Sequence, residues 1–218
     1  MPFIVIDGID GSGKTVQTKL LVGALRDHGV DCYELDFPRY DRDSSTLVKH
    51  YLSGDYGMEA NDVNPYTASM FFAVDQAASY LDDWKERYLR NEVIISNRYS
   101  TSSLIHQGAK LPMEKRYGFF RWLSETIHDH MDLPIPDMTI LLDVTPNLSA
   151  EFRSHGDRQR TGDIHENNEQ HLYDAWKTAR MACDHFNWER IPYDGVSNTP
   201  GEIHNRILSV VNNRFKLF

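Results

Sequence analysis

Short apolar runs alternate with longer amphipathic stretches along most of the chain. The apolar runs predict five strands, at 3–6, 31–36, 93–96, 138–143 and 189–193. The stretches between them predict helices near 14–28, 44–53, 66–90, 114–131, 146–153, 166–187 and 200–215. Strands that are separated by helices favour a parallel sheet, because the connection between parallel strands crosses over one face. The pattern predicts an α/β fold in three layers, a five-stranded parallel sheet with helices on both faces.

Parallel order would bring several loops to one edge of this sheet. Ligands of such sheets bind beyond the carboxyl ends of the strands. The loops at 7–15, 37–42 and 96–103, and the segment after residue 143, are therefore expected to surround one cleft. No internal repeat or low-complexity linker divides the 218 residues, so we expect a single domain over 1–218.

The overall charge restricts the expected partners. The formal net charge is −9, so the chain on average repels nucleic acid and anionic membranes, and neither is an expected partner. No apolar run approaches the length of about 18 residues that a transmembrane helix needs. The predicted strand at the start leaves no room for a signal peptide. Together with two distant cysteines, Cys32 and Cys183, interpreted as free thiols, this predicts a cytoplasmic location.

Residues 8–15, with the sequence GIDGSGKT, match the phosphate-binding pattern G-x-x-x-x-G-K-T. The glycines let backbone N–H groups converge on phosphate oxygens, and the start of the next helix adds a favourable dipole. Lys14 would reach the β- and γ-phosphates, and Thr15 would offer a hydroxyl to Mg²⁺. A glycine-rich turn without a ligand is the alternative, but the position between a strand and an amphipathic helix favours nucleotide binding. The predicted ATP-binding residues are Gly8, Asp10, Gly11, Ser12, Gly13, Lys14 and Thr15.

Three further motifs fall where the cleft is expected. Arg98 follows the strand at 93–96, and Arg39 follows a proline after the strand at 31–36, so either guanidinium could reach a phosphate. Phe72 and Gln76 lie one turn apart on the predicted helix 66–90, which suits stacking on a base and reading its edge. Taken alone, the phenylalanine is better explained as a core residue.

The segment 153–165 is polar, contains two glycines and carries Arg153, Arg158 and Arg160. It interrupts the helical pattern of the segments that precede and follow it. Its plainest interpretation is a surface loop. Its functional interpretation is a short basic lid, which would close over phosphates and exclude water.

These motifs together resemble those of the thymidylate kinase family of P-loop nucleoside-monophosphate kinases. The resemblance covers most of the chain. It rests on DGIDGSGKT at 7–15 followed by Gln17, Phe-Pro-Arg at 37–39, FAVDQ at 72–76, Asn-Arg-Tyr at 97–99 with Ser102 and Ser103, and DIHE at 163–166.

The resemblance implies an ATP:dTMP phosphotransferase of dTTP synthesis, with Mg²⁺ accompanying ATP, in a homodimer. It implies that Asp10 accepts from the sugar 3′-hydroxyl and that Phe72 stacks on the base. The full set implied for the acceptor is Asp10, Phe37, Arg39, Phe72, Gln76, Arg98, Tyr99, Ser103 and His106. Because the glycine-rich loop has no arginine, the resemblance places that charge in the lid, as in bacterial members. The implied catalytic set is Lys14, Asn97, Arg98, Arg153, Arg158 and Arg160.

Two positions depart from the family pattern. Asn97 stands where the family has an aspartate, so the shape is kept and the charge is lost. Asp7, Asp10, Asp143 and Glu166 are the expected candidates to replace that charge. Gln76 stands where the family usually has an arginine that reads the base, and an amide can both donate and accept. We therefore order the acceptors as dTMP, then dUMP, then a purine deoxynucleotide.

These departures keep two other classes open. A nucleotide-binding protein that has lost catalysis would explain both, although the retained Lys14, Arg39 and Arg98 argue against it. A P-loop ATPase or switch would use an acidic residue at a strand end, and Ile140-Leu141-Leu142-Asp143 partly fits. A switch would leave Phe72 and the basic segment without a role.

Overall fold

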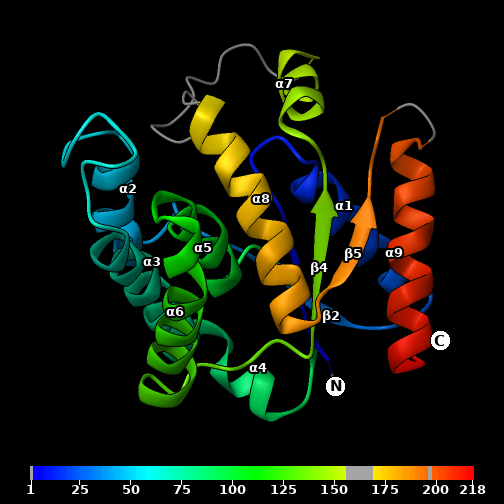
Figure 1. Ribbon diagram of the computed structural model, residues 1–218. Helices are drawn as coiled ribbons and strands as arrows, with labels where there is room; N and C mark the ends of the chain where they lie inside the picture. The colour runs from blue at the N-terminus through cyan, green and yellow to red at the C-terminus, as the bar shows by residue number, and fades with distance from the viewer. Residues whose placement is uncertain (1, 156–168, 196–197) are drawn as a thin grey trace.

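The centre of the molecule is a five-stranded parallel sheet (Figure 1). The structure, a computed structural model, describes residues 2–155, 169–195 and 198–218. The strands are β1 (Phe3–Asp7), β2 (Cys32–Asp36), β3 (Val93–Asn97), β4 (Met138–Asp143) and β5 (Glu189–Pro192). Their order in the sheet is β2-β3-β1-β4-β5, and every pairing is parallel. The predicted fold class is confirmed.

The helices join and cover these strands. They are α1 (Lys14–Asp27), α2 (Thr46–Leu52), α3 (Pro65–Ser79), α4 (Lys85–Leu89), α5 (Ser100–His106), α6 (Met113–Ser124), α7 (Pro146–His155), α8 (Glu169–Phe186) and α9 (Pro200–Phe215). Short 3₁₀ turns lie at Asp43–Ser45 and Gly108–Lys110, and π-helical turns lie at Tyr80–Trp84 and Glu125–His130.

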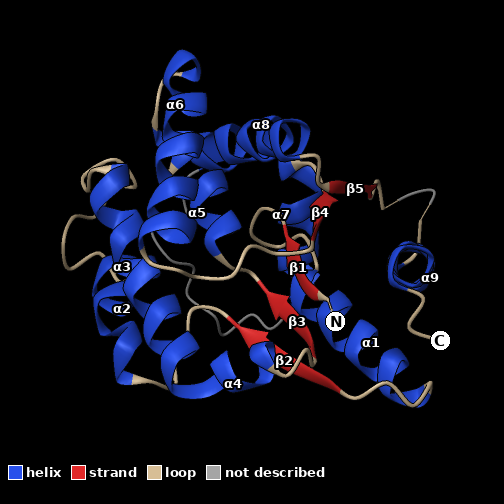
Figure 2. Cartoon of the chain, turned by 90° about the horizontal axis from the view of Figure 1, so that it is seen from below, coloured by secondary structure: helices blue, strands red, loops and turns tan. Residues whose placement is uncertain are grey.

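The two faces of the sheet are buried by different helices, as Figure 2 shows from below. Side chains of alternate strand residues, such as Ile4 and Ile6, pack with α1 and α9 in one core. The residues between them, such as Phe3 and Val5, pack with aromatic side chains from the α3–α6 side. Because successive side chains of a strand point to opposite faces, five consecutive buried residues in β1 require both cores.

One loop prediction needs correction, and one predicted helix contains a turn that the pattern did not reveal. The segment 96–103 was expected to be a loop, but α5 begins at Ser100. Its four hydroxyl residues are typical of a loop, yet the Thr101 and Ser102 hydroxyls donate to the buried Asp7 carboxylate. The predicted helix 66–90 is present as α3, a π-helical turn and α4, and the turn places Tyr80 and Trp84 together in the core. Periodicity of 3.6 residues does not report such a local insertion.

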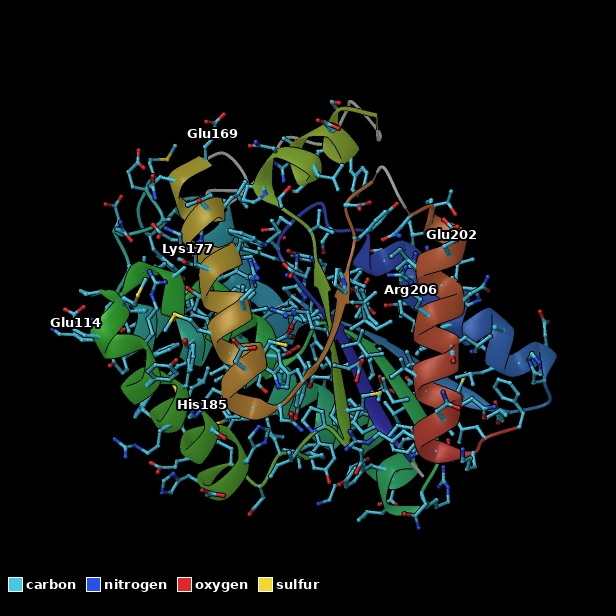
Figure 3. All side chains as sticks on the ribbon, turned by 45° about the vertical axis from the view of Figure 1, so that its right-hand side comes forward. Glu114, Glu169, Lys177, His185, Glu202 and Arg206 are labelled. Atoms are coloured by element: carbon cyan, nitrogen blue, oxygen red, sulfur yellow. The ribbon has the colours of Figure 1, made fainter. Side chains whose placement is uncertain are left out.

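The last helix, α9, begins at a capping box and packs against α1. Thr199 accepts from the backbone N–H of Glu202, and the Glu202 carboxylate accepts from the backbone N–H of Thr199. Figure 3 labels Glu202 at this end of α9 and Arg206 further along it. Within the described ranges, no helix combines the length and the apolar character needed to cross a bilayer.

Candidate functional site

A cavity of about 750 Å³ lies at the carboxyl ends of the strands. In Figure 1 this is the edge toward which the β4 arrow points, next to α7. The cavity extends from the glycine-rich loop to α3 and α5. The predicted site residues that line it are Asp10, Gly11, Gly13, Lys14, Thr15, Phe37, Phe72, Gln76, Asn97, Arg98, Tyr99, Ser103, His106 and Arg153.

The glycine-rich loop curls tightly around the Lys14 ammonium. Gly8, Gly11 and Gly13 have positive φ angles of 152°, 76° and 90°, a region that side chains disfavour. Lys14 Nζ donates to the carbonyl oxygens of Gly8 and Ile9 at 3.0 and 2.7 Å. The ammonium therefore lies at the centre of the loop, at the start of α1, where anions are favoured.

Asp7 ties the loop to α5 from below. Its fully buried carboxylate accepts from the Gly8 backbone N–H at 2.8 Å and from Thr101 and Ser102 at 2.5 and 2.8 Å. A carboxylate that is committed to these donors supports the loop. The expectation that Asp7 replaces the charge missing at Asn97 is not supported by this placement.

Arg98 and Asp10 form an ion pair inside the cavity. Arg98 Nη2 donates to Asp10 Oδ1, and His106 Nδ1 lies 3.9 Å from Asp10 Oδ2. Burial opposes the charge of Arg98, but the carboxylates of Asp10 and Asp7 outweigh it and raise its pKa. Burial, assisted by the charge of Arg98, lowers the pKa of His106 to about 3. His106 is thus a neutral ring beside a permanent ion pair at pH 7.

Helix α7 holds the other side of the glycine-rich loop. Arg153 Nη1 donates to the Asp10 carbonyl at 3.0 Å and to Ser149 Oγ at 2.6 Å. Ser149 Oγ itself donates to the Asp10 carbonyl. Arg153 therefore enters the cavity from the start of the predicted lid. Arg158, Arg160 and Glu166 lie outside the described residues.

Phe72 and Gln76 lie at the far end of the cavity, on α3. The Phe72 ring meets Tyr51 edge to face, with centroids 6.0 Å apart. Gln76 is 3% exposed, and its Oε1 has no hydrogen-bond partner among the described residues. A buried carbonyl without a partner is costly, so this position favours a ligand that donates to it.

Arg39 lies elsewhere than expected. Its guanidinium donates to Ser79 Oγ at 2.9 Å and to Asp83 Oδ2 at 2.8 Å. Among the residues that line the cavity are its neighbours Pro38 and Tyr40, but not Arg39 itself. The carboxylate that holds it comes from the π-helical turn, which the sequence pattern did not reveal. Its role toward an acceptor phosphate stays a prediction.

Asp143 also lies away from the cavity. It accepts from Trp176 Nε1 at 2.8 Å and lies 3.7 Å from Arg180 Nε. This residue would have been the metal ligand of a P-loop switch. Its partners are instead both on α8, so the placement gives the switch interpretation no support.

Several cavity residues were missed by sequence reasoning. Gln107 follows α5, and Phe152 on α7 and Tyr193 after β5 also line the cavity, with ring centroids 5.1 Å apart. Asp36 ends β2 beside Asn97. Asp36 ends a predicted strand directly before the Phe-Pro-Arg motif, but its place beside Asn97 follows only from the strand order.

The loop and the end of β3 fit a magnesium ion bound with a nucleotide. Asn97 Nδ2 donates to Thr15 Oγ1 at 3.2 Å and to Asp36 Oδ1 at 2.8 Å. Asn97 Oδ1 is buried without a partner among the described residues. Hydroxyl, amide and carboxylate oxygens suit Mg²⁺, which takes few protein ligands when phosphates supply the others. In the described ranges, no group of three or more His, Cys, Asp or Glu side chains could hold a metal alone.

Comparison with known proteins gives a consistent result. The family model described as thymidylate kinase matches residues 6–198. The chain is 31% identical over 160 residues to a thymidylate kinase of Mycobacterium tuberculosis, covering 72% of each chain. It is 29% identical over 163 residues to a probable thymidylate kinase of Pyrobaculum aerophilum, covering 73% of this chain and 74% of the relative. It is 25% identical over 214 residues to a thymidylate kinase of Ligilactobacillus salivarius, covering 97% of each.

Proposed function

The chain belongs to the thymidylate kinase family, and we propose that it transfers the γ-phosphoryl group of ATP to dTMP. A phosphate oxygen of dTMP attacks the γ-phosphorus, the bond to the β,γ-bridging oxygen breaks, and dTDP and ADP are formed. The observation that carries this proposal is the single cavity that joins the glycine-rich loop to Arg98, Phe72 and Gln76. An ATPase would need only the part of that cavity beside the glycine-rich loop.

On the donor side, the loop and Lys14 bind the triphosphate. The Lys14 ammonium exchanges its carbonyl partners for β- and γ-phosphate oxygens, which are stronger acceptors because they are charged. Phe152 and Tyr193 flank the same end and offer rings to the adenine base. Thr15 and Asn97 would hold Mg²⁺, which when bound neutralises phosphate charge.

On the acceptor side, the Asp10–Arg98 pair receives the nucleotide. Arg98 holds the 5′-phosphate, and Asp10 accepts from the sugar 3′-hydroxyl. Phe72 stacks on the base, and the unpaired Gln76 Oε1 accepts from the N3–H of thymine. A thymine carbonyl can accept from the amide N–H₂ of the same side chain, so one glutamine can read both groups.

The transfer itself depends on position and charge, since a phosphoryl group needs little covalent help from the protein. Arg153 brings one positive charge to the loop from α7. Arg158 and Arg160 would add two more over the transferred group, as in bacterial relatives of the family. We further propose a cytoplasmic homodimer, and sedimentation velocity of the purified protein tests the dimer.

The proposal is tested by ADP formation from ATP and Mg²⁺ against a panel of nucleoside monophosphates. Acceleration by dTMP above dUMP and the purine deoxynucleotides is the expected result. Acceleration only by another monophosphate would reassign the substrate. ADP release that ignores every acceptor would contradict the kinase proposal in favour of an ATPase, and binding without turnover would contradict it in favour of a sensor.

A further inference from the structure

Asn97 leaves the end of β3 without the negative charge that the family pattern has there. The neighbouring strand, β2, supplies a negative charge at the same edge of the sheet. Strands β2 and β3 pair in register, with Asp36 opposite Asn97 at their carboxyl ends, and both residues line the cavity. The two side chains are joined by the hydrogen bond from Asn97 Nδ2 to Asp36 Oδ1, at 2.8 Å.

The Asn97 amide bridges Asp36 to the glycine-rich loop. Its Nδ2 donates to both Asp36 and Thr15, which uses both of its hydrogens. Its Oδ1 is buried and has no partner among the described residues, although Asn97 is only 6% exposed. An unsatisfied acceptor at this depth points to a ligand that donates or coordinates there.

Asp36 is the carboxylate that is joined to Thr15 through Asn97. Among the described residues, Asp10 and Asp36 are the acidic side chains that line the cavity. Asp10 is paired with Arg98, whereas Asp7 and Asp143 serve the loop and α8. Asp36 is exposed at the cavity wall. Through the Asn97 amide, its charge can act on a cation beside Thr15.

We propose that Asp36 is a positioning residue for the Mg²⁺ that accompanies the bound nucleotide. It acts through Asn97, and its carboxylate lies on β2, one strand away from the position of the family's aspartate. The proposal rests on the proposed function for its nucleotide, but not on the identity of the acceptor. Asn97 keeps the length and shape of the family's aspartate, and its amide donates a hydrogen bond that an aspartate could not make, to Asp36, which supplies the charge behind it. A carboxylate at both positions would place like charges where the hydrogen bond now lies, which is unfavourable.

The test is a cycle of four proteins: the unchanged chain, Asp36→Asn, Asn97→Asp and the double variant that exchanges the two side chains. ADP affinity is measured by calorimetry with Mg²⁺ and with EDTA, so that no acceptor and no turnover are involved. Asp36→Asn is expected to weaken the Mg²⁺-dependent part of the affinity by about tenfold, the lower range for residues that orient metal ligands. The affinity in EDTA stays unchanged.

The exchange variant tests whether weaker binding comes from the loss of the carboxylate charge or from a change in folding. Asp36→Asn with Asn97→Asp is expected to restore the Mg²⁺ dependence, because it returns one carboxylate and one amide to the pair. Asp31→Asn, before the other end of β2, is the matched control and should leave both affinities unchanged. Thermal melts show that each variant is folded.

Two results would overturn the proposal. One is an Asp36→Asn variant that melts normally and keeps its full Mg²⁺ dependence. The other is an exchange variant as weak as Asp36→Asn. If no monophosphate is phosphorylated and the cycle still behaves as expected, the proposed function fails and the role of Asp36 stands.

Discussion

Arg98 adopts a backbone conformation that a residue with a side chain usually avoids. Its φ is 67°, in the left-handed region, which costs about 1 kcal/mol or more outside glycine. Two contacts hold it there: its N–H donates to the Ile6 carbonyl at 3.1 Å, and its carbonyl accepts from Ser96 Oγ at 2.5 Å. The turn directs the guanidinium to Asp10, which indicates that the strain serves the site.

Replacing Arg98 by Ala tests that conclusion. The acceptor loses a charge-assisted partner for its phosphate, so its KM is expected to rise by about tenfold or more. The KM for ATP should change by less than about twofold, because the loop and Lys14 are untouched. Steady-state kinetics with each substrate varied in turn measure both values.

Two further variants frame this measurement. Arg98→Lys keeps the positive charge but loses the planar pair of guanidinium donors. Its KM for the acceptor should therefore lie between the values of the unchanged protein and of Arg98→Ala. Arg206→Ala removes the same charge from an exposed residue of α9 that does not line the cavity, and should behave as the unchanged protein (Figure 3). An unchanged acceptor KM in Arg98→Ala would remove this residue from the site.

At the scale of elements, the glycine-rich loop and α7 approach too closely for any side chain at position 11. A Cβ on Gly11 would lie 2.8 Å from the Ser149 carbonyl and 2.9 Å from Arg153 Cγ. Its φ of 76° disfavours a side chain as well. Gly11→Ala is therefore expected to destabilise the protein by about 1–3 kcal/mol.

Gly23→Ala provides the matched control on α1. A Cβ there meets nothing within 4 Å, and alanine is the better helix former, so a gain of about 0.5–1 kcal/mol is expected. Urea unfolding of both variants gives the comparison. Equal stability of the two would mean that the loop and α7 separate easily.

Lys110 joins the turn after α5 to the α2 side of the molecule. Its Nζ donates to Tyr51 Oη at 2.6 Å and to the Val63 carbonyl at 3.1 Å. Burial lowers the pKa of Lys110 to about 7. Between about pH 7 and its ordinary value of about 10.5, the unfolded chain binds more protons at this residue than the folded chain. The folded state therefore gains stability as pH rises through that range.

Lys110→Met should remove this pH dependence. Relative to the variant, the unchanged protein is expected to gain up to about 1.4 kcal/mol per pH unit between pH 7.5 and 9. Lys177→Met on α8, whose ammonium lies 4.5 Å from the Tyr173 ring centre, is the control and should show little change. Urea midpoints at several pH values measure the difference, and a constant difference would show that Lys110 titrates normally.

The elements themselves were largely predictable from sequence. All five strands and the long helices lie where the apolar pattern placed them, because each buries a continuous face. The pattern did not reveal α5 or the π-helical turn of Tyr80–Trp84. Both depend on partners distant in sequence, namely the Asp7 carboxylate and the aromatic core around Phe3.

At the scale of the whole molecule, the site residues also divide into those that local sequence predicts and those that depend on distant packing. Residues fixed by local motifs, such as Lys14 and Arg98, line the cavity as expected. Arg39 does not, because its partner Asp83 depends on how a distant helix packs. Asp36 was overlooked because its meaning depends on strand order: only a sheet that places β2 beside β3 puts it next to Asn97.

The whole cavity predicts tight binding of one molecule that spans both substrate positions. The chain has a net charge of −9, yet Lys14, Arg98 and Arg153 gather at this single cavity. Adenosine and thymidine joined by five phosphates would fill the donor end at Tyr193 and the acceptor end at Phe72 together. Once one nucleoside is bound, the other binds intramolecularly. The affinity of the linked compound should therefore exceed that of ATP by about 100-fold.

Calorimetry with this compound, and with two adenosines joined by five phosphates as the control, measures the effect. The control should bind less tightly, because a purine is larger than the thymine expected between Phe72 and Gln76, even though its amino group could also donate to Gln76 Oε1. Equal affinity for the two compounds would mean that the acceptor end does not read thymine. Affinity no better than that of ATP would mean that the donor and acceptor ends cannot be occupied in line, and phosphoryl transfer between them would then be impossible.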